Sequence, residues 1–68
     1  MKWLIQMYRV KQHIKSDTEL AKRTGIKRQH FYTLMNQPER IRLSELRMLD
    51  EILKFSDEDL LKIIRGEL

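Results

Sequence analysis

Four polar side chains with the chemistry to recognise DNA bases lie close together in the sequence. They are Arg28, Gln29, Tyr32 and Thr33. Arginine can donate two hydrogen bonds to a guanine and glutamine can form two with an adenine, both from the major groove. A threonine can bond a base or contact a thymine methyl group, and a tyrosine can reach a phosphate or a base edge. On a helix the four side chains share one face, and Arg28 and Gln29 are the expected main readers of bases.

The helix that would carry these side chains has an unusual start, because Lys27 and Arg28 stand at its N-terminus. A cation near the positive end of a helix dipole costs a few tenths to about 1 kcal/mol. Two other expected helix starts, "SDTE" at 16–19 and "SDED" at 56–59, have a serine cap followed by acids. Departures from local preference are expected at functional sites. We interpret the basic start as a surface for an anion, with a phosphate at Lys27 and a guanine edge at Arg28.

The elements that must position these residues are helices, since only one proline and two glycines interrupt 68 residues. Apolar residues recur at helical spacing. The expected helices cover about 2–13, 17–23, 28–35, 43–54 and 57–65. In the first of them, Trp3 and Tyr8 are interpreted as core residues rather than as a stacking platform for bases. The predicted fold class is all-α, a compact bundle of about five short helices that forms a single domain over residues 1–68.

The second and third helices are joined by a tight turn. Ser16 is expected to accept a hydrogen bond from the Glu19 backbone, and the Glu19 carboxylate to reach back to the Ser16 N–H, as in a capping box. Gly25 stands where the helix end needs a left-handed residue. Ala21, four residues earlier, is small enough to let the two helices cross closely. Residues 17–36 therefore predict a helix-turn-helix.

The last helix has more apolar residues than one buried face requires. Leu60, Leu61 and Ile64 are expected to face the core, which leaves Ile63 and Leu68 on a wider apolar arc. We interpret these two as a dimer contact, since a symmetric patch also suits palindromic DNA.

Charge is distributed unevenly along the chain. Residues 1–34 hold eight Lys/Arg against two acids, a net of +6, and residues 35–68 hold six against eight, a net of −2. A basic half on a small domain favours a polyanionic partner.

Several other classes of protein find no support in the sequence. There is no cysteine, and the two histidines lie seventeen residues apart, so neither a disulfide nor a metal site is expected. No nucleophile stands in a catalytic arrangement and no glycine-rich phosphate loop is present, so we expect no enzyme, no cofactor and no small-molecule ligand. No apolar run approaches the roughly 20 residues that span a bilayer, and no signal peptide is recognised, so a cytoplasmic protein without a membrane partner is expected.

The stretch "TELAKRTGIKRQHFYTLMN" resembles the helix-turn-helix of the Cro and phage-repressor family, also called the Xre-type family. The matching residues are Leu20, Ala21, Gly25, Ile26, Phe31, Leu34 and Asn36. The closing "LSELRMLDEILKFSDEDLL" resembles the family's fourth and fifth helices, so the likeness covers nearly the whole chain. The resemblance implies a lambda-repressor-like DNA-binding domain with the third helix in the major groove, and symmetric dimers on palindromic sites.

Further contacts follow for the residues that flank the third helix. The expected phosphate-binding residues are Thr18, Lys27, Asn36, Arg40 and Arg42. Asp17 departs from the family pattern, which often has a glutamine there facing a phosphate. Because a carboxylate at that place repels DNA unless it is neutralised, we hypothesise that Asp17 pairs with Arg28 and orients it.

These observations predict a sequence-specific double-stranded DNA-binding regulator, a Cro-type repressor from a phage or bacterium that acts as a homodimer on a palindromic operator. Two alternatives stay open. The chain is a protein-interaction module, such as an antitoxin or anti-repressor that kept the fold, or it binds DNA architecturally with little sequence preference.

Overall fold

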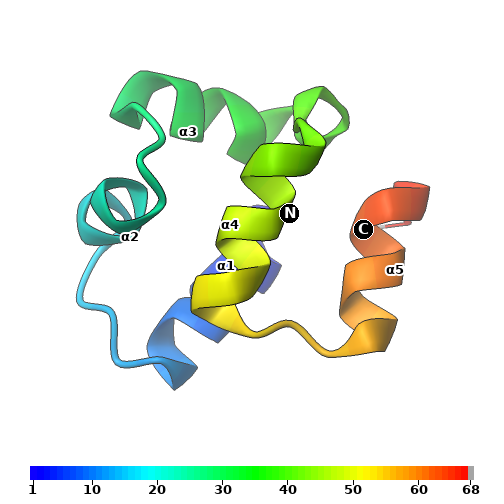
Figure 1. Cartoon of the computed structure of the whole chain (residues 1–68), viewed down its shortest axis with the longest axis horizontal. Coiled ribbons are helices and arrows are strands. Elements are labelled where there is room, and N and C mark those ends of the chain that lie inside the picture. Colours follow the sequence, from blue (N-terminus) through cyan, green and yellow to red (C-terminus); the bar gives the residue numbers. More distant parts are fainter. Residues whose placement is uncertain (68) are drawn as a thin grey trace.

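The computed structural model describes residues 1–67, in which five α-helices and one short 3-10 helix pack around one core (Figure 1). In chain order the elements are α1 (Lys2–Lys11), α2 (Asp17–Thr24), α3 (Arg28–Asn36), η1 (Pro38–Arg40), α4 (Leu43–Leu53) and α5 (Asp57–Arg65). No strand occurs in this range. The all-α prediction is confirmed, and α1 ends two residues earlier than expected.

Helix α4 runs through the middle of the molecule, and the other helices surround it (Figure 1). In this view α1 lies behind α4, α2 lies to the left, α3 crosses the top, and α5 stands apart on the right. The molecule measures 27 × 23 × 19 Å along its principal axes. Helices of only 8 to 11 residues are marginal in isolation, so their stability comes from the shared core.

The ends of α2 follow the local rules with one difference. Ser16 Oγ accepts a hydrogen bond from the Glu19 N–H at 3.2 Å, as predicted. The Glu19 carboxylate, however, accepts from the N–H of Lys15 rather than from that of Ser16. This bond and the Arg23 guanidinium hold the pKa of Glu19 below its ordinary value. Gly25 ends the helix with φ 73°, a left-handed conformation that glycine adopts without a steric penalty.

The segment between α3 and α4 forms a single 3-10 turn that the sequence did not predict. Pro38 stands at its first position, where the missing N–H costs nothing. Arg42 then precedes α4 and has no side-chain oxygen to cap it. Instead, Glu45 Oε1 accepts the Arg42 N–H at 2.9 Å, which is one half of a capping box.

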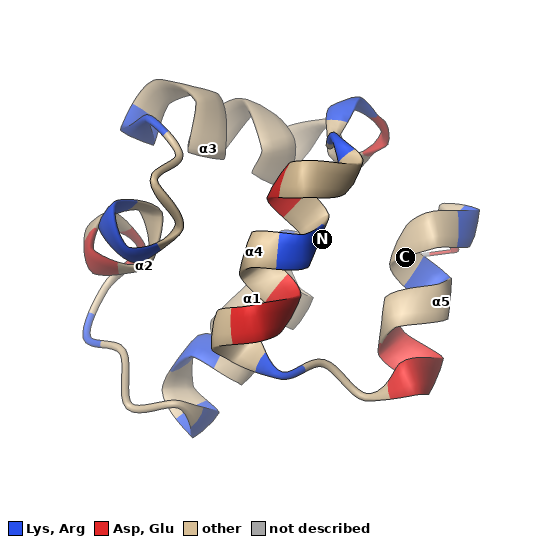
Figure 2. Cartoon of the chain, viewed as in Figure 1, with Lys and Arg blue, Asp and Glu red and all other residues tan. Residues whose placement is uncertain are grey.

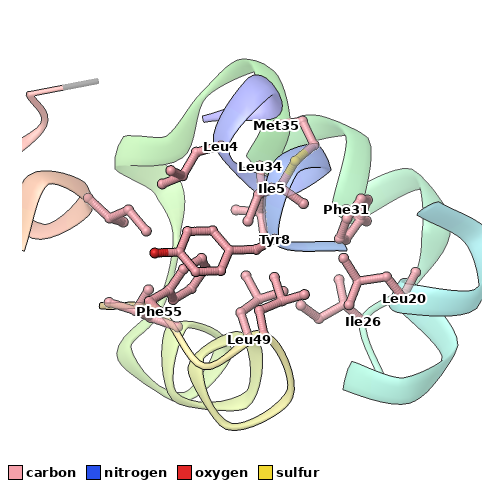
Figure 3. Packing of buried hydrophobic residues seen from close by; sticks show 14 of the residues in the cluster. Leu4, Ile5, Tyr8, Leu20, Ile26, Phe31, Leu34, Met35, Leu49 and Phe55 are labelled. Carbon is pink, nitrogen blue, oxygen red and sulfur yellow. The ribbon is translucent and has the colours of Figure 1, made fainter. Parts of the chain in front are cut away.

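The core draws side chains from all five α-helices (Figure 3). The largest fully buried side chains are Phe31, Ile5, Leu20, Leu34, Leu49 and Leu53. Tyr8 is also buried and meets Phe55 edge-on, with ring centroids 4.9 Å apart. The prediction that Tyr8 belongs to the core is therefore confirmed. The same prediction for Trp3 is wrong, because 76% of that residue is exposed.

The orientation of α5 also differs from the prediction. Ile63 is buried in the core, whereas Leu61 and Ile64 are exposed. The reason is a hydrogen bond from the Tyr8 hydroxyl to the carboxylate of Asp59, which turns the Asp59 side of α5 inward. Asp59 and Ile63 are four residues apart and so share a helix face. Ile63 therefore cannot be an exposed dimer contact, and the other predicted contact, Leu68, lies outside the described residues.

No helix within residues 1–67 has the length and apolar character that crossing a bilayer requires.

Candidate nucleic-acid interface

The crossing of α2 and α3 is closed by small and apolar side chains. Ala21 is buried in α2, and Ile26 and Phe31 are buried at the turn and in α3. The Thr24 hydroxyl donates to the Ala21 carbonyl at 2.9 Å, and its Oγ1 accepts the Ile26 N–H at 3.4 Å. Thr24 was not singled out from the sequence, although a threonine directly before the turn glycine was the available signal. The turn is thus fixed by a buried side chain as well as by Gly25.

This crossing presents one face of α3 to solvent. Arg28, Gln29 and Tyr32 are exposed, and Thr33 is half-buried. The opposite, buried face of the helix consists of Phe31, Leu34 and Met35. The Thr33 hydroxyl donates to the backbone carbonyl of Gln29 at 3.2 Å, so its proton is already used while its oxygen can still accept. The four side chains predicted to read bases therefore lie on one side of α3, and Thr33 is the least accessible of them.

Arg28 and Tyr32 interact with each other on this face. The guanidinium carbon of Arg28 lies 5.7 Å from the centre of the Tyr32 ring, within the range of a cation–π contact. They are four residues apart, so the helix brings them together. The contact restrains a long side chain whose planar group must be aligned to pair with a base. Tyr32 is therefore the side chain against which the Arg28 guanidinium lies.

The hypothesis that Asp17 pairs with Arg28 is wrong. Asp17 Oδ1 lies 3.2 Å from the Nε of Arg9, as an ion pair without hydrogen-bond alignment. Arg9 also donates from its terminal nitrogen to the Ile14 carbonyl at 2.8 Å, which fixes the guanidinium between α1 and the start of α2. The carboxylate at the N-terminus of α2 is thus neutralised, as the sequence argument required, but by a residue of the preceding helix.

Basic residues mark both ends of α3 (Figure 2). Lys27 precedes the helix without providing a side-chain cap, as expected, and Arg40 and Arg42 follow the helix on the 3-10 turn and the loop after it. The five residues predicted to bind phosphate are all exposed: Thr18, Lys27, Asn36, Arg40 and Arg42. One acid, Glu39, lies beside Arg40 on the 3-10 turn, and the densest group of acids is at the first turn of α5. The cations therefore flank the exposed face of α3 at each end.

Glu45 links α3 to α4 and was missed in the sequence. Its Oε2 lies 2.6 Å from the Nε2 of His30, while its Oε1 accepts the Arg42 N–H. His30 is half-buried, on the side of α3 turned toward α4. One carboxylate thus ties the first turn of α3 to the backbone at the start of α4. The glutamate three residues after a non-capping arginine was the only signal for it.

Comparison with known proteins agrees with this geometry. The family of Cro/C1-type HTH DNA-binding domains matches residues 5–66. The chain belongs to this family. Neither the curated proteins nor the solved structures gave a match. The match covers α2, α3 and the turn between them, together with the helices that support them.

Membership of the Cro/C1-type family confirms the resemblance seen in the sequence. The chain is a DNA-binding regulator of the helix-turn-helix class. Its helix-turn-helix is α2, the turn at Gly25, and α3.

Proposed function

We propose that this Cro/C1-type domain is a sequence-specific repressor that reads the major groove with α3. The observation that carries the proposal is the exposed face of α3. Arg28, Gln29 and Tyr32 are exposed on it, and within residues 1–67 the side chains of Arg28 and Gln29 make no hydrogen bond, since the Thr33 hydroxyl bonds only the backbone of Gln29. The side chains that pack α3 into the core lie on its other face, so the exposed side chains are available to contact bases.

Phosphate contacts at both ends of α3 would set the register of the protein on DNA. Lys27 stands at the start of the helix, and Arg40 and Arg42 follow its end. Thr18 and Asn36 complete the proposed set. Such contacts position a protein without reading sequence, and they make its affinity strongly dependent on salt. The uneven charge of the chain supports this orientation, with the acidic first turn of α5 away from α3 (Figure 2).

We further propose a homodimer on a palindromic operator, although not through Ile63. The surface available for it, here called the α4–α5 patch, consists of Pro38, Ile41, Leu43 and Ile64. These residues line a hollow of about 240 Å³ between the start of α4 and α5. Leu43 is 62% and Ile64 is 61% exposed, an unusual state for large aliphatic side chains. Repression would follow by occluding polymerase from a promoter in the cytoplasm of a bacterium.

The first experiment is selection of binding sites from a random duplex pool. We expect enrichment of a half-site containing guanine and adenine, repeated about one helical turn away. Arg28→Ala is expected to relax the preference at one base pair and to cost roughly 1–3 kcal/mol on the selected site. Arg47→Ala removes an exposed arginine from α4 and serves as the matched control, which should select the same sequence as the wild type.

Other results of this selection would contradict the proposal. Binding of many sequences with similar affinity and equally steep salt dependence would indicate an architectural factor. An unchanged preference in Arg28→Ala would remove Arg28 as a reader of bases. Absence of DNA binding even at low salt would favour the alternative of a protein-interaction module.

The dimer has a test of its own. Ile64→Asp is expected to abolish cooperative binding to the full palindrome while leaving the affinity for a single half-site unchanged. Quantitative gel-shift titrations on both duplexes would measure this. Leu61→Asp changes an exposed aliphatic residue of α5 outside the α4–α5 patch and should behave like the wild type. If Ile64→Asp lowered the affinity for the half-site and for the palindrome equally, Ile64 would be needed for folding and not for a dimer contact.

A further inference from the structure

The outer face of α1 carries an apolar stripe whose two ends are used neither by the core nor by the proposed DNA contacts, while its middle residue, Met7, is partly buried and also packs against the core. It consists of Trp3, Met7 and Val10, called here the α1 stripe. Trp3 is 76% and Val10 is 62% exposed. Their spacing of four and then three residues aligns them on one side of the helix, opposite to the buried Leu4, Ile5 and Tyr8. In Figure 1, α1 lies behind α4 and apart from α3 at the top.

Two shallow hollows lie beside the stripe. One hollow of about 440 Å³ is lined by Trp3, Gln6, Met7, Val10 and Lys11. A second, of about 300 Å³, lies on the other side of Trp3, between α1 and α5. The indole thus stands as a ridge between two depressions. Large apolar side chains of a partner could fill such depressions, which is how helices are commonly recognised.

The charges around the stripe select one kind of occupant. Helix α1 contains no acidic residue. At 100° per residue, Lys2 lies on one side of the stripe at its start and Lys11 on the other side at its end. Lys11 also lies over the Tyr8 ring, with its ammonium 5.3 Å from the centre, which holds it beside the stripe. The second hollow is also lined by Asp59, which is engaged by Tyr8, and by Lys62 and Glu67, whose charges are opposite.

We propose that the α1 stripe binds an acidic amphipathic helix of a partner protein. The partner helix that complements the stripe has apolar residues at i, i+4 and i+7 and carboxylates at both ends. A second copy of this chain fits less well, because pairing two α1 stripes would bring together two helices that carry lysines and no acidic residue.

Trp3 is the single tryptophan of the chain, so its fluorescence reports on this site alone. The probe is a synthetic helical peptide without tryptophan, with leucines at i, i+4 and i+7 and glutamates at both ends. We expect a saturable shift of Trp3 emission to shorter wavelength as the indole leaves water. The same peptide with lysines in place of the glutamates is expected to bind about tenfold more weakly.

Variants make the test specific to the stripe. Val10→Asp should abolish the emission shift while leaving DNA affinity unchanged, which separates this proposal from the proposed function and shows that the variant is folded. Leu61→Asp, at an exposed leucine of α5, should bind the peptide like the wild type. Combining Lys2→Glu with Lys11→Glu should reverse the preference, so that the lysine peptide binds better.

Three outcomes would overturn the proposal. Equal affinity for the two peptides, or none for either, would remove the acidic partner. An emission shift that depends on protein concentration alone, and disappears in Val10→Asp, would assign the stripe to a second copy. Quenching of Trp3 by single-stranded DNA, with no response to the peptide, would make the stripe a stacking surface.

Discussion

At the scale of residues, the charge at the start of α2 depends on a partner in another helix. Arg9 neutralises Asp17 across the α1–α2 junction. An unneutralised carboxylate there would repel the DNA backbone. We therefore propose that Arg9 supports DNA binding without contacting DNA.

We expect Arg9→Ala to weaken DNA binding by roughly 1 kcal/mol, because it exposes the negative charge of Asp17. Adding Asp17→Asn should restore most of that loss, while Asp17→Asn alone should change affinity little. Affinities of the four proteins for one duplex, measured at one salt concentration, form the double-mutant cycle. Arg23→Ala, which breaks the exposed Glu19–Arg23 pair, is the matched control and should not be rescued by Asp17→Asn. Additive effects of Arg9→Ala and Asp17→Asn would contradict the coupling.

The sequence predicted the residues on the exposed face of α3 well and their partners poorly. Arg28, Gln29 and Tyr32 follow from helical periodicity once Phe31 and Leu34 are assigned to the core. That Tyr32 lies beside Arg28 also follows from their spacing, although it was not predicted. The partner of Asp17 could not be deduced, since Arg9 reaches it only through the packing of two helices. Contacts of this kind depend on the fold and not on a local pattern.

At the scale of elements, the backbone at Gly25 sets the angle between α2 and α3. Its φ of 73° is unfavourable for any residue with a Cβ, yet a Cβ there would meet no atom within 4 Å. The turn therefore needs glycine for its conformation and not for space.

Gly25→Ala is expected to lower the free energy of unfolding by roughly 1–2 kcal/mol, the cost of the left-handed conformation. Because no clash arises, the crossing should persist and the selected DNA sequence should stay the same. Chemical denaturation and site selection measure the two effects. Gly66→Ala is the matched control, with φ 68° and equally open space but at the last turn of α5, where the loss should be smaller. A changed DNA preference in Gly25→Ala would show that the angle had moved.

The order and type of the helices could be predicted, but the rotation of α5 could not. Leu60, Leu61, Ile63 and Ile64 offer several possible buried faces, and hydrophobicity alone does not choose among them. The choice is made by the bond between Tyr8 and Asp59, which are 51 positions apart. A polar contact between distant residues thus decides which apolar side chains remain for partners.

At the scale of the whole molecule, this same contact makes folding stability depend on pH. The hydrogen bond from the Tyr8 hydroxyl holds the pKa of Asp59 below its ordinary value of 3.8, despite opposing desolvation. A carboxyl whose pKa is lower in the folded state stabilises the fold above its ordinary pKa. That contribution is lost as the pH falls through the folded value.

Asp59→Asn should therefore flatten the dependence of unfolding free energy on pH below about pH 4, relative to the wild type. Denaturant titrations between pH 7 and pH 2 would measure the slopes. Some dependence should remain, because Glu19 also has a lowered pKa. Asp57→Asn, at an exposed carboxyl of the same turn, is the control. Parallel curves for the wild type and Asp59→Asn would contradict the assignment.

The separation of the two faces of α3 has a consequence for how this regulator could change over time. Phe31 and Leu34 hold the helix in the core, whereas Arg28 and Gln29 take no part in packing. Substitutions at positions 28 and 29 should therefore alter the preferred operator with little effect on folding. A lineage of such proteins could acquire new target sites through single substitutions while its scaffold stays constant. The same property makes α3 a practical starting point for reprogramming specificity by design.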